Sequence, residues 1–130
     1  MNSAQFEQAV LRITARKSDI HKDAYFFLKE ALDLSIKRNE ASPGTDSHVT
    51  AEQLLAAFRD HAIEEYGPMS GTLLAEWGIK KTADVGTMVF DLIEERMFGR
   101  QESDSESDFV DVYTFQDAFV QPFLPAGASA

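Results

Sequence analysis

The chain has 130 residues, of which 44% are hydrophobic and 26% charged, a composition typical of one folded domain with a hydrophobic core. It has no cysteine, which excludes disulfide bonds, thiolate nucleophiles and cysteine-ligated metal sites. The formal net charge is −10, and residues 91–130 contribute −7 with nine Asp or Glu and two Lys or Arg, which argues against nucleic acid and anionic membranes as partners.

The N-terminal third of the chain predicts two helices. Apolar residues at helical spacing indicate a first helix over residues 4–16 and a second, longer helix that Ser18 or Asp19 caps and that ends near Asn39. Apolar residues are spread widely around the second helix, so we expect it to be buried on more than one side. Residues 41–48 have the composition of a loop.

The middle of the chain predicts a third helix with well-defined ends. Thr50 and Gln53 have the spacing of a capping box, in which each side chain bonds the backbone of the other residue. Gly67 stands where a left-handed C-terminal cap is expected, and Pro68 prevents the helix from continuing.

Two more helices are predicted before residue 100. Ser70 begins a short fourth helix that Gly78 ends, and Thr82 caps a fifth helix that Gly99 stops. Gly86 lies inside the fifth helix, where glycine costs about 1 kcal/mol relative to alanine. We expect a close helix contact there, beneath Trp77, rather than a ligand contact.

The C-terminal part of the chain is less regular. Residues 100–108 predict a polar, acidic loop, and residues 109–113 predict a short strand or an extended arm. Thr114 caps a last helical turn that runs to Phe119. We expect a single helical domain over residues 1–124 and a flexible tail over 125–130.

These elements predict a mainly α fold, a compact bundle of five to six helices with a short extended or β segment near the C-terminus. Residues 70–115 follow the element order of a winged helix, which would make the fifth helix a DNA-recognition helix. That helix carries acids such as Asp91 and Glu94 where DNA binding needs cations, so the shape and the function are separate hypotheses. The expected core contains Phe27, Leu28, Leu55, Phe58, Leu74, Trp77, Val89, Phe90 and Ile93.

No motif for catalysis or phosphate binding occurs in the chain. His61 with Glu64 and Glu65 on neighbouring helical turns, and Asp60 beside them, suggest a divalent-ion site, but a solvated helix surface explains the same pattern. We therefore predict no catalytic residue, no cofactor and no metal, and we expect a protein that is not an enzyme.

The aromatic and acidic residues of the last third are the candidate partner-binding residues. The first interpretation of the aromatic side chains is that they complete the core, and the second is that they dock on a protein partner or a second copy of the chain. For the acidic side chains, the first interpretation is a solvated face that aids solubility, and the second is a surface for a basic protein partner. The candidates are Phe109, Tyr113, Phe115, Phe119, Glu102, Asp104 and Glu106.

Several motifs resemble a family of small bacterial proteins of about this length that have no established activity. The resemblance rests on Tyr66-Gly-Pro-Met69, Leu74-x-x-Trp77-Gly78-Ile79, Asp84-x-Gly86-x-x-Val89-Phe90 and Tyr113-x-Phe115-x-x-Ala118-Phe119-x-x-Pro122-Phe123. The N-terminal Ala24-Tyr25-Phe26-Phe27 is similar as well, so the likeness covers nearly the whole chain. Tyr66 and Thr114 depart from the pattern, in which Phe and Asp are more frequent. The resemblance implies no activity and no site residues.

The function that these observations favour is a non-catalytic protein-interaction or regulatory module with an acidic surface. The alternatives are a winged-helix regulator that associates with nucleic acid, and a metal-binding protein or an enzyme of another type. No apolar run is long enough to cross a membrane and the N-terminus lacks the features of a signal peptide, so we expect a cytoplasmic protein that is able to form homo-oligomers.

Overall fold

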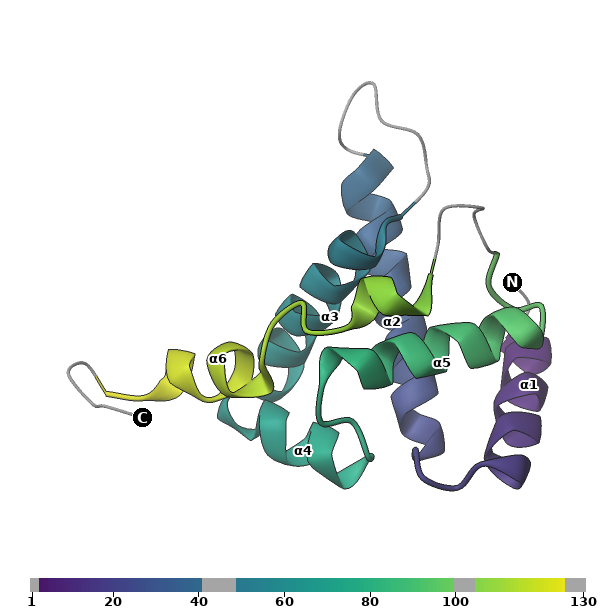
Figure 1. The fold of residues 1–130 in the computed structure, drawn as a ribbon, viewed down its shortest axis with the longest axis horizontal. Coiled ribbons are helices and arrows are strands. Elements are labelled where there is room, and N and C mark those ends of the chain that lie inside the picture. The colour runs from purple at the N-terminus through teal and green to yellow at the C-terminus, as the bar shows by residue number, and fades with distance from the viewer. Residues whose placement is uncertain (1–2, 41–48, 100–104, 126–130) are drawn as a thin grey trace.

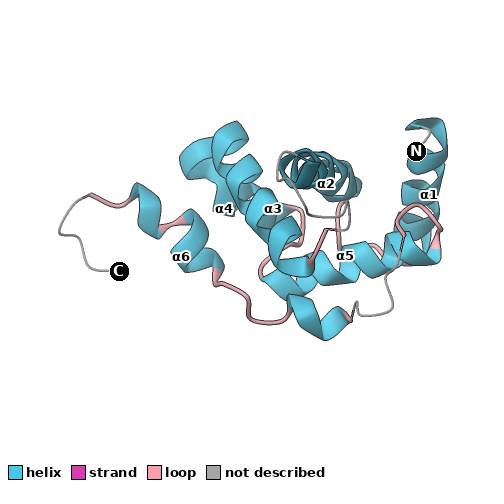
Figure 2. Cartoon of the chain, turned by 90° about the horizontal axis from the view of Figure 1, so that it is seen from above, coloured by secondary structure: helices cyan, strands magenta, loops and turns pink. Residues whose placement is uncertain are grey.

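A computed structural model describes residues 3–40, 49–99 and 105–125. The fold is mainly α, as predicted, and these residues contain no β-strand. α1 and α6 lie at opposite ends of the longest axis, with α2, α3 and α5 between them (Figures 1 and 2). In chain order the elements are α1 (Ser3–Arg16), α2 (Lys22–Glu40), α3 (Ala51–Tyr66), the 3-10 turn η1 (Gly67–Met69), α4 (Ser70–Glu76), α5 (Thr82–Glu94), η2 (Glu106–Phe109), α6 (Phe115–Phe119) and η3 (Gln121–Phe123).

α2 and α3 form the centre of the fold. Leu28 of α2 and Leu55 and Phe58 of α3 are fully buried. The predicted capping box of α3 is confirmed, because Gln53 donates its backbone N–H to Thr50 Oγ1 at 3.1 Å and Thr50 N–H donates to Gln53 Oε1 at 2.9 Å. α2 begins later than predicted, at Lys22.

The corner after α3 carries α4 back across the molecule. Gly67 has φ +51° and ψ −131°, so its backbone is not the left-handed helical cap that we expected, although its N–H still bonds Ile63 O. Ser70 begins α4, as predicted; it is buried, and its hydroxyl donates to Ala62 O at 3.0 Å. The hydroxyl thus ties α4 to α3.

The ends of α5 differ from the prediction. Thr82 does not cap the N-terminus: Lys81 has the N-cap position, and Asp84, the third residue of the helix, accepts the backbone N–H groups of Lys80 and Lys81 at 2.9 and 3.2 Å. The helix ends at Glu94, before Gly99. Arg96 takes the left-handed conformation with φ +62°, and Met97 N–H bonds Leu92 O at 2.9 Å, which is the Schellman pattern that usually has glycine at the left-handed position.

The predicted strand at residues 109–113 is wrong. Ser105 caps η2, which ends at Phe109, and the chain then turns through Asp111 at φ +53°. The winged-helix arrangement therefore lacks its predicted strand: Val110 N–H bonds Ser107 O within the turn, and Val112 N–H bonds the Thr82 side chain instead of a strand. Residues 41–48 and 100–104, which we expected to form loops, and 126–130, in the expected tail, lie outside the described part.

The described helices share one hydrophobic core. Six of the nine predicted core residues are buried, whereas Trp77, Phe90 and Ile93 are half-buried and pack against the core from outside. The core also includes Tyr25, which is 1% exposed and whose hydroxyl donates to the carboxylate of Asp91 at 3.0 Å. Burial, with the nearby Asp91 charge, raises the pKa of Tyr25 well above its ordinary value of 10.

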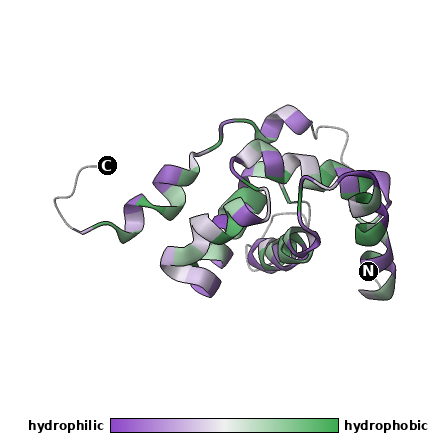
Figure 3. Cartoon of the chain, turned by 90° about the horizontal axis from the view of Figure 1, so that it is seen from below, coloured by the Kyte–Doolittle hydropathy of each residue, from purple (hydrophilic) through white to green (hydrophobic). Residues whose placement is uncertain are grey.

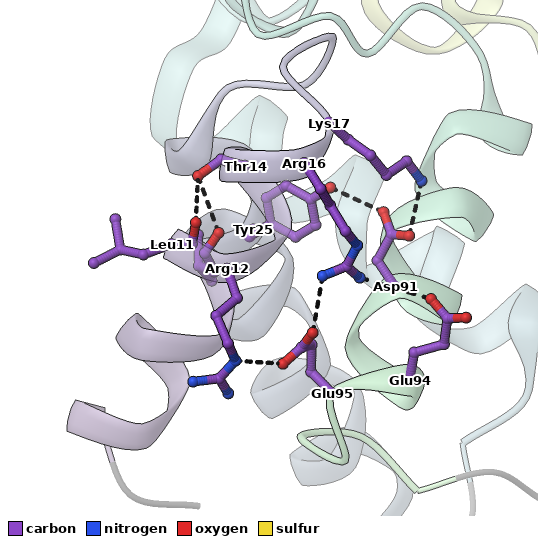
Figure 4. Close-up of polar contacts among 10 residues, drawn as sticks. Leu11, Arg12, Thr14, Arg16, Lys17, Tyr25, Asp91, Glu94 and Glu95 are labelled. Atoms are coloured by element: carbon purple, nitrogen blue, oxygen red, sulfur yellow. Dashed lines mark hydrogen bonds and ion pairs between the residues drawn. The ribbon is translucent and has the colours of Figure 1, made fainter.

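A network of ion pairs fastens α1 to α5 (Figure 4). Lys17 Nζ lies 2.8 Å from Asp91 Oδ1, and Asp91 is 5% exposed. Arg12 and Arg16 contact the two carboxylate oxygens of Glu95 at 2.7 and 2.9 Å. Hydrogen bonds from these guanidinium groups, with that of Arg12 first, hold the pKa of Glu95 below its ordinary value. Arg12, Arg16 and Lys17, in and just after α1, thus form ion pairs with acidic side chains at the end of α5.

Gly86 allows Phe109 to pack directly on the backbone of α5, rather than Trp77 as we expected. A Cβ added to Gly86 would lie 2.7 Å from Phe109 Cβ and 2.8 Å from Phe109 Cγ. These atoms are the base of the side chain, so rotation of the ring does not relieve the overlap. Phe109 is 5% exposed, and its burial therefore depends on glycine at position 86.

We expect Gly86→Ala to lower the free energy of unfolding by about 1–2 kcal/mol, because overpacking against Phe109 outweighs the gain in helix propensity. Gly71→Ala is the matched control. Gly71 is also helical, but its added Cβ would make an ordinary 3.6 Å contact with Phe119 Cβ, so that variant is expected to gain up to about 1 kcal/mol. Urea denaturation measures both, and equal changes in the two variants would contradict the close contact at Gly86.

Candidate interaction surface

The C-terminal arm, residues 105–125, is folded by local caps at two points. Ser105 Oγ accepts the N–H of Ser107 at 3.3 Å, and Asp108 returns the bond by accepting Ser105 N–H at 3.0 Å. The predicted cap of α6 is confirmed, because Asp117 N–H donates to Thr114 Oγ1 at 3.1 Å. These caps give the arm a defined backbone in a segment that has no strand or long helix.

Four contacts attach the arm to the helices. Phe109 packs on α5, and Phe119, which is 1% exposed, packs near Gly71 of α4. Tyr113 donates its hydroxyl to Leu55 O at 2.8 Å, and burial raises the pKa of that phenol above its ordinary range. Val112 N–H donates to Thr82 Oγ1 at 3.2 Å, which is the structural role that Thr82 has instead of capping α5.

These positions separate the predicted partner-binding residues into groups. Phe109 and Phe119 are buried and complete the core, so their rings do not reach a partner in this conformation. Tyr113 and Phe115 are half-buried and lie beside each other with ring centroids 6.3 Å apart. Glu106 is exposed. Glu102 and Asp104 lie outside the described residues.

The arm exposes apolar side chains that the sequence analysis did not select. Val110 is 51% exposed, Val112 37%, Val120 38% and Phe123 36%. Figure 3 shows the arm as a mixture of hydrophobic and hydrophilic residues that extends beyond α3 and α4. Val120 is the residue that follows α6, and no pattern in the sequence distinguishes it from the buried Ala118 and Phe119.

Asp111 produces the exposure of the two valines beside it. Its φ of +53° is a conformation that Asp and Asn tolerate better than other non-glycine residues. The turn is fixed on one side by Val110 N–H, which bonds Ser107 O at 3.1 Å, and on the other by the bond from Val112 N–H to Thr82. Because hydrogen bonds fix the backbone of this turn, Val110 and Val112 are exposed to solvent in a defined conformation.

All charged side chains of the arm are acidic. Residues 105–125 contain four carboxylates and no Lys or Arg, and all four are exposed: Glu106, Asp108, Asp111 and Asp117. Two shallow grooves border α6, one of about 310 Å³ on the side of α3 and one of about 400 Å³ on the side of α4. The arm therefore combines exposed apolar side chains, negative charge and concave surface.

The histidine cluster does not have the geometry of a metal site. His61 Nε2 lies 2.8 Å from Glu30 Oε1 of α2, and Asp60 is paired with Arg38 at 3.0 Å. Across residues 3–40, 49–99 and 105–125, no three or more His, Asp or Glu side chains gather so that they could hold a metal ion.

The comparisons with known proteins returned nothing that assigns the chain. It matches no protein-family profile, no curated protein and no solved structure. None of the described helices has both the length and the apolar character needed to cross a bilayer.

Proposed function

We propose that the protein is a non-catalytic interaction module whose C-terminal arm binds a basic protein partner. The observation that carries this proposal is the exposure of Val110, Val112, Val120 and Phe123 on a segment with four carboxylates and no cation. Apolar side chains at the centre of a contact surface supply binding energy, and charges around them select the partner and speed its association.

The chemistry of the described residues supports a binding role over catalysis. Asp91, the carboxylate with the most buried surroundings, is already bonded by Lys17 and Tyr25. Within the described ranges every buried polar side-chain atom has a hydrogen-bond partner, so none is left aimed at a substrate.

The charge distribution also weakens the alternative of nucleic-acid binding. Arg12, Arg16 and Lys17 are held by the acids of α5, so they are already neutralised by the helix that would have to enter the major groove. A second copy of this chain would place one acidic arm against another, which makes homo-oligomers through the arm weaker than a complex with a basic partner. We further propose a bacterial, cytoplasmic protein, which rests on the motif resemblance and the absence of cysteine.

The test is quantitative capture from a nuclease-treated lysate of the host, with the full-length chain as bait. We expect a basic protein to be recovered in stoichiometric amount, and we expect the variant that combines Val110→Ser, Val112→Ser and Val120→Ser to recover at least tenfold less of it. Leu11→Ser is the matched control, because Leu11 is 49% exposed on α1, at the other end of the molecule.

Capture that is equal for the arm variant and the control would contradict the proposal. So would a partner that is lost on nuclease treatment, which would instead support the nucleic-acid alternative. Circular dichroism of each variant shows whether the helices are intact. Because the three valines are exposed, we expect their substitution to change the free energy of unfolding by less than about 0.5 kcal/mol each.

A further inference from the structure

A second surface, separate from the arm, is formed by three aromatic rings that we call the aromatic corner: Phe27 of α2, Tyr66 at the end of α3 and Trp77 just after α4. The Tyr66 and Trp77 rings are nearly perpendicular, at 86°, with centroids 6.0 Å apart. The Phe27 ring lies 5.7 Å from the first and 5.8 Å from the second. Phe27 is buried, whereas Tyr66 and Trp77 are half-buried.

The backbone around the corner is firmly held. Trp77 O accepts the N–H of His21 at 2.9 Å, which joins the end of α4 to the segment that precedes α2. Tyr66 is followed by the Gly67–Met69 turn, which ends α3. The two half-exposed rings are therefore set at fixed helix ends, which favours a preorganised site over a mobile one.

Three carboxylates lie on the helices that carry two of these rings. Asp23 and Glu30 lie four residues before and three residues after Phe27, so both share its face of α2, and Glu65 is adjacent to Tyr66. Burial raises the pKa of Tyr66, and the charges of Glu30, Glu65 and Asp23 raise it further. Glu30 also contacts His61 at 2.8 Å but keeps 63% of its side chain exposed, so its carboxylate is accessible to a ligand.

We propose that the aromatic corner binds an organic cation, of which the guanidinium group of arginine is the best fit. The faces of Trp and Tyr rings attract cations through their quadrupole, and a guanidinium group also donates hydrogen bonds that a carboxylate such as Glu30 accepts. Simple core packing explains Phe27, but it does not require three carboxylates around two half-exposed rings. An anion would be repelled by the same carboxylates, and a neutral apolar ligand would gain nothing from them.

The chain has a single tryptophan, Trp77, so its fluorescence reports on this site alone. We expect ethylguanidinium chloride and choline chloride each to cause a saturable change in emission, with half-saturation on the order of 1–30 mM for such small cations. Sodium chloride at equal ionic strength, and 3,3-dimethylbutan-1-ol, the uncharged isostere of choline, should give no saturable change.

Two variants and a control locate the binding. Tyr66→Leu removes one wall of the corner, and Glu30→Gln removes one charge from a side chain that is 63% exposed while it keeps an oxygen for His61. We expect at least about threefold weaker binding in each. Glu52→Gln, at the opposite end of α3, removes the same charge far from the corner and should leave the titration unchanged. If Tyr66→Leu unfolds, Glu30→Gln carries the test.

A response to the uncharged isostere equal to that of choline would overturn the proposal, as would an absence of saturation up to about 100 mM. Binding that is unchanged in Glu30→Gln and in folded Tyr66→Leu would do the same. The test needs no partner protein, so its outcome is independent of whether the C-terminal arm binds one.

Discussion

Replacing Gly78 by alanine is expected to destabilise the fold by at least about 3 kcal/mol. Gly78 has φ +90°, which costs L-residues about 1–2 kcal/mol, and an added Cβ would lie well inside contact distance of Asp19 O. It would also lie 3.2 Å from Asp19 C and 3.4 Å from Ile20 Cα, so the obstruction is backbone on all sides and no rotamer change relieves it. The segment between α1 and α2 must move for alanine to fit.

Gly67→Ala separates the two causes. Gly67 also has a positive φ, +51°, but nothing lies within 4 Å of its added Cβ. The free energy of unfolding of this control is expected to fall only by the cost of the positive φ for alanine, about 1–2 kcal/mol. Urea denaturation followed by circular dichroism, with Trp77 fluorescence as a second probe beside Gly78, measures both variants. If Gly78→Ala lost no more stability than Gly67→Ala, the close approach to Asp19 would be wrong.

Removing the carboxylate of Asp91 is the second large effect. We expect Asp91→Ala to lower the free energy of unfolding by about 2–4 kcal/mol, because the buried hydroxyl of Tyr25 loses its acceptor and the methyl group leaves unfilled space. The lost ion pair with Lys17 adds little to this figure. The Lys17 side chain is 37% exposed, so water takes over its ammonium group.

A double-mutant cycle tests the pairing of Asp91 with Tyr25 in particular. Tyr25→Phe removes the hydroxyl, and in that background Asp91→Ala leaves no buried donor unpaired. The double variant is therefore expected to be at least about 1 kcal/mol more stable than the sum of the single changes predicts. Strict additivity in equilibrium denaturation would show that the 3.0 Å hydrogen bond contributes nothing.

The local signals in the sequence located most of the helices correctly. The capping box at Thr50 and Gln53 and the cap at Thr114 are short-range patterns, in which both partners lie within three residues, and the structure has both. The errors have a common physical origin in tertiary contacts. Thr82 is a residue type that often caps helices, but its hydroxyl accepts the N–H of Val112, thirty residues away. The N-cap position belongs to Lys81, whose N–H bonds the Asp84 carboxylate.

The candidate surface was predicted at the level of the segment and not of the residue. Aromatic residues were selected because large rings are frequent in interfaces, but burial depends on which neighbour offers space. Gly86 lacks a side chain and so leaves the space that Phe109 fills, and no pattern in the sequence indicates that these two positions are in contact. The exposed valines were passed over because valine is usually a core residue.

The aromatic corner was missed for a similar reason. Trp77 was expected to be a core residue, and Tyr66 was noted as part of a motif. Their proximity to Phe27 and Glu30 arises from the crossing of α2 over the ends of α3 and α4, and such a crossing is set by packing over the whole fold.

The dependence of Phe109 on Gly86 also bears on how the protein is made. During synthesis the N-terminal part of a chain leaves the ribosome first, and α5 emerges before the residue that covers its glycine. Until Phe109 and then Phe119 have been added, the sides of α5 and α4 that they cover remain apolar and open. The core of this protein is thus closed by residues that are translated after the helices they cover, so a product that ends before Phe109 has exposed hydrophobic surface, the kind of surface that chaperones and proteases recognise.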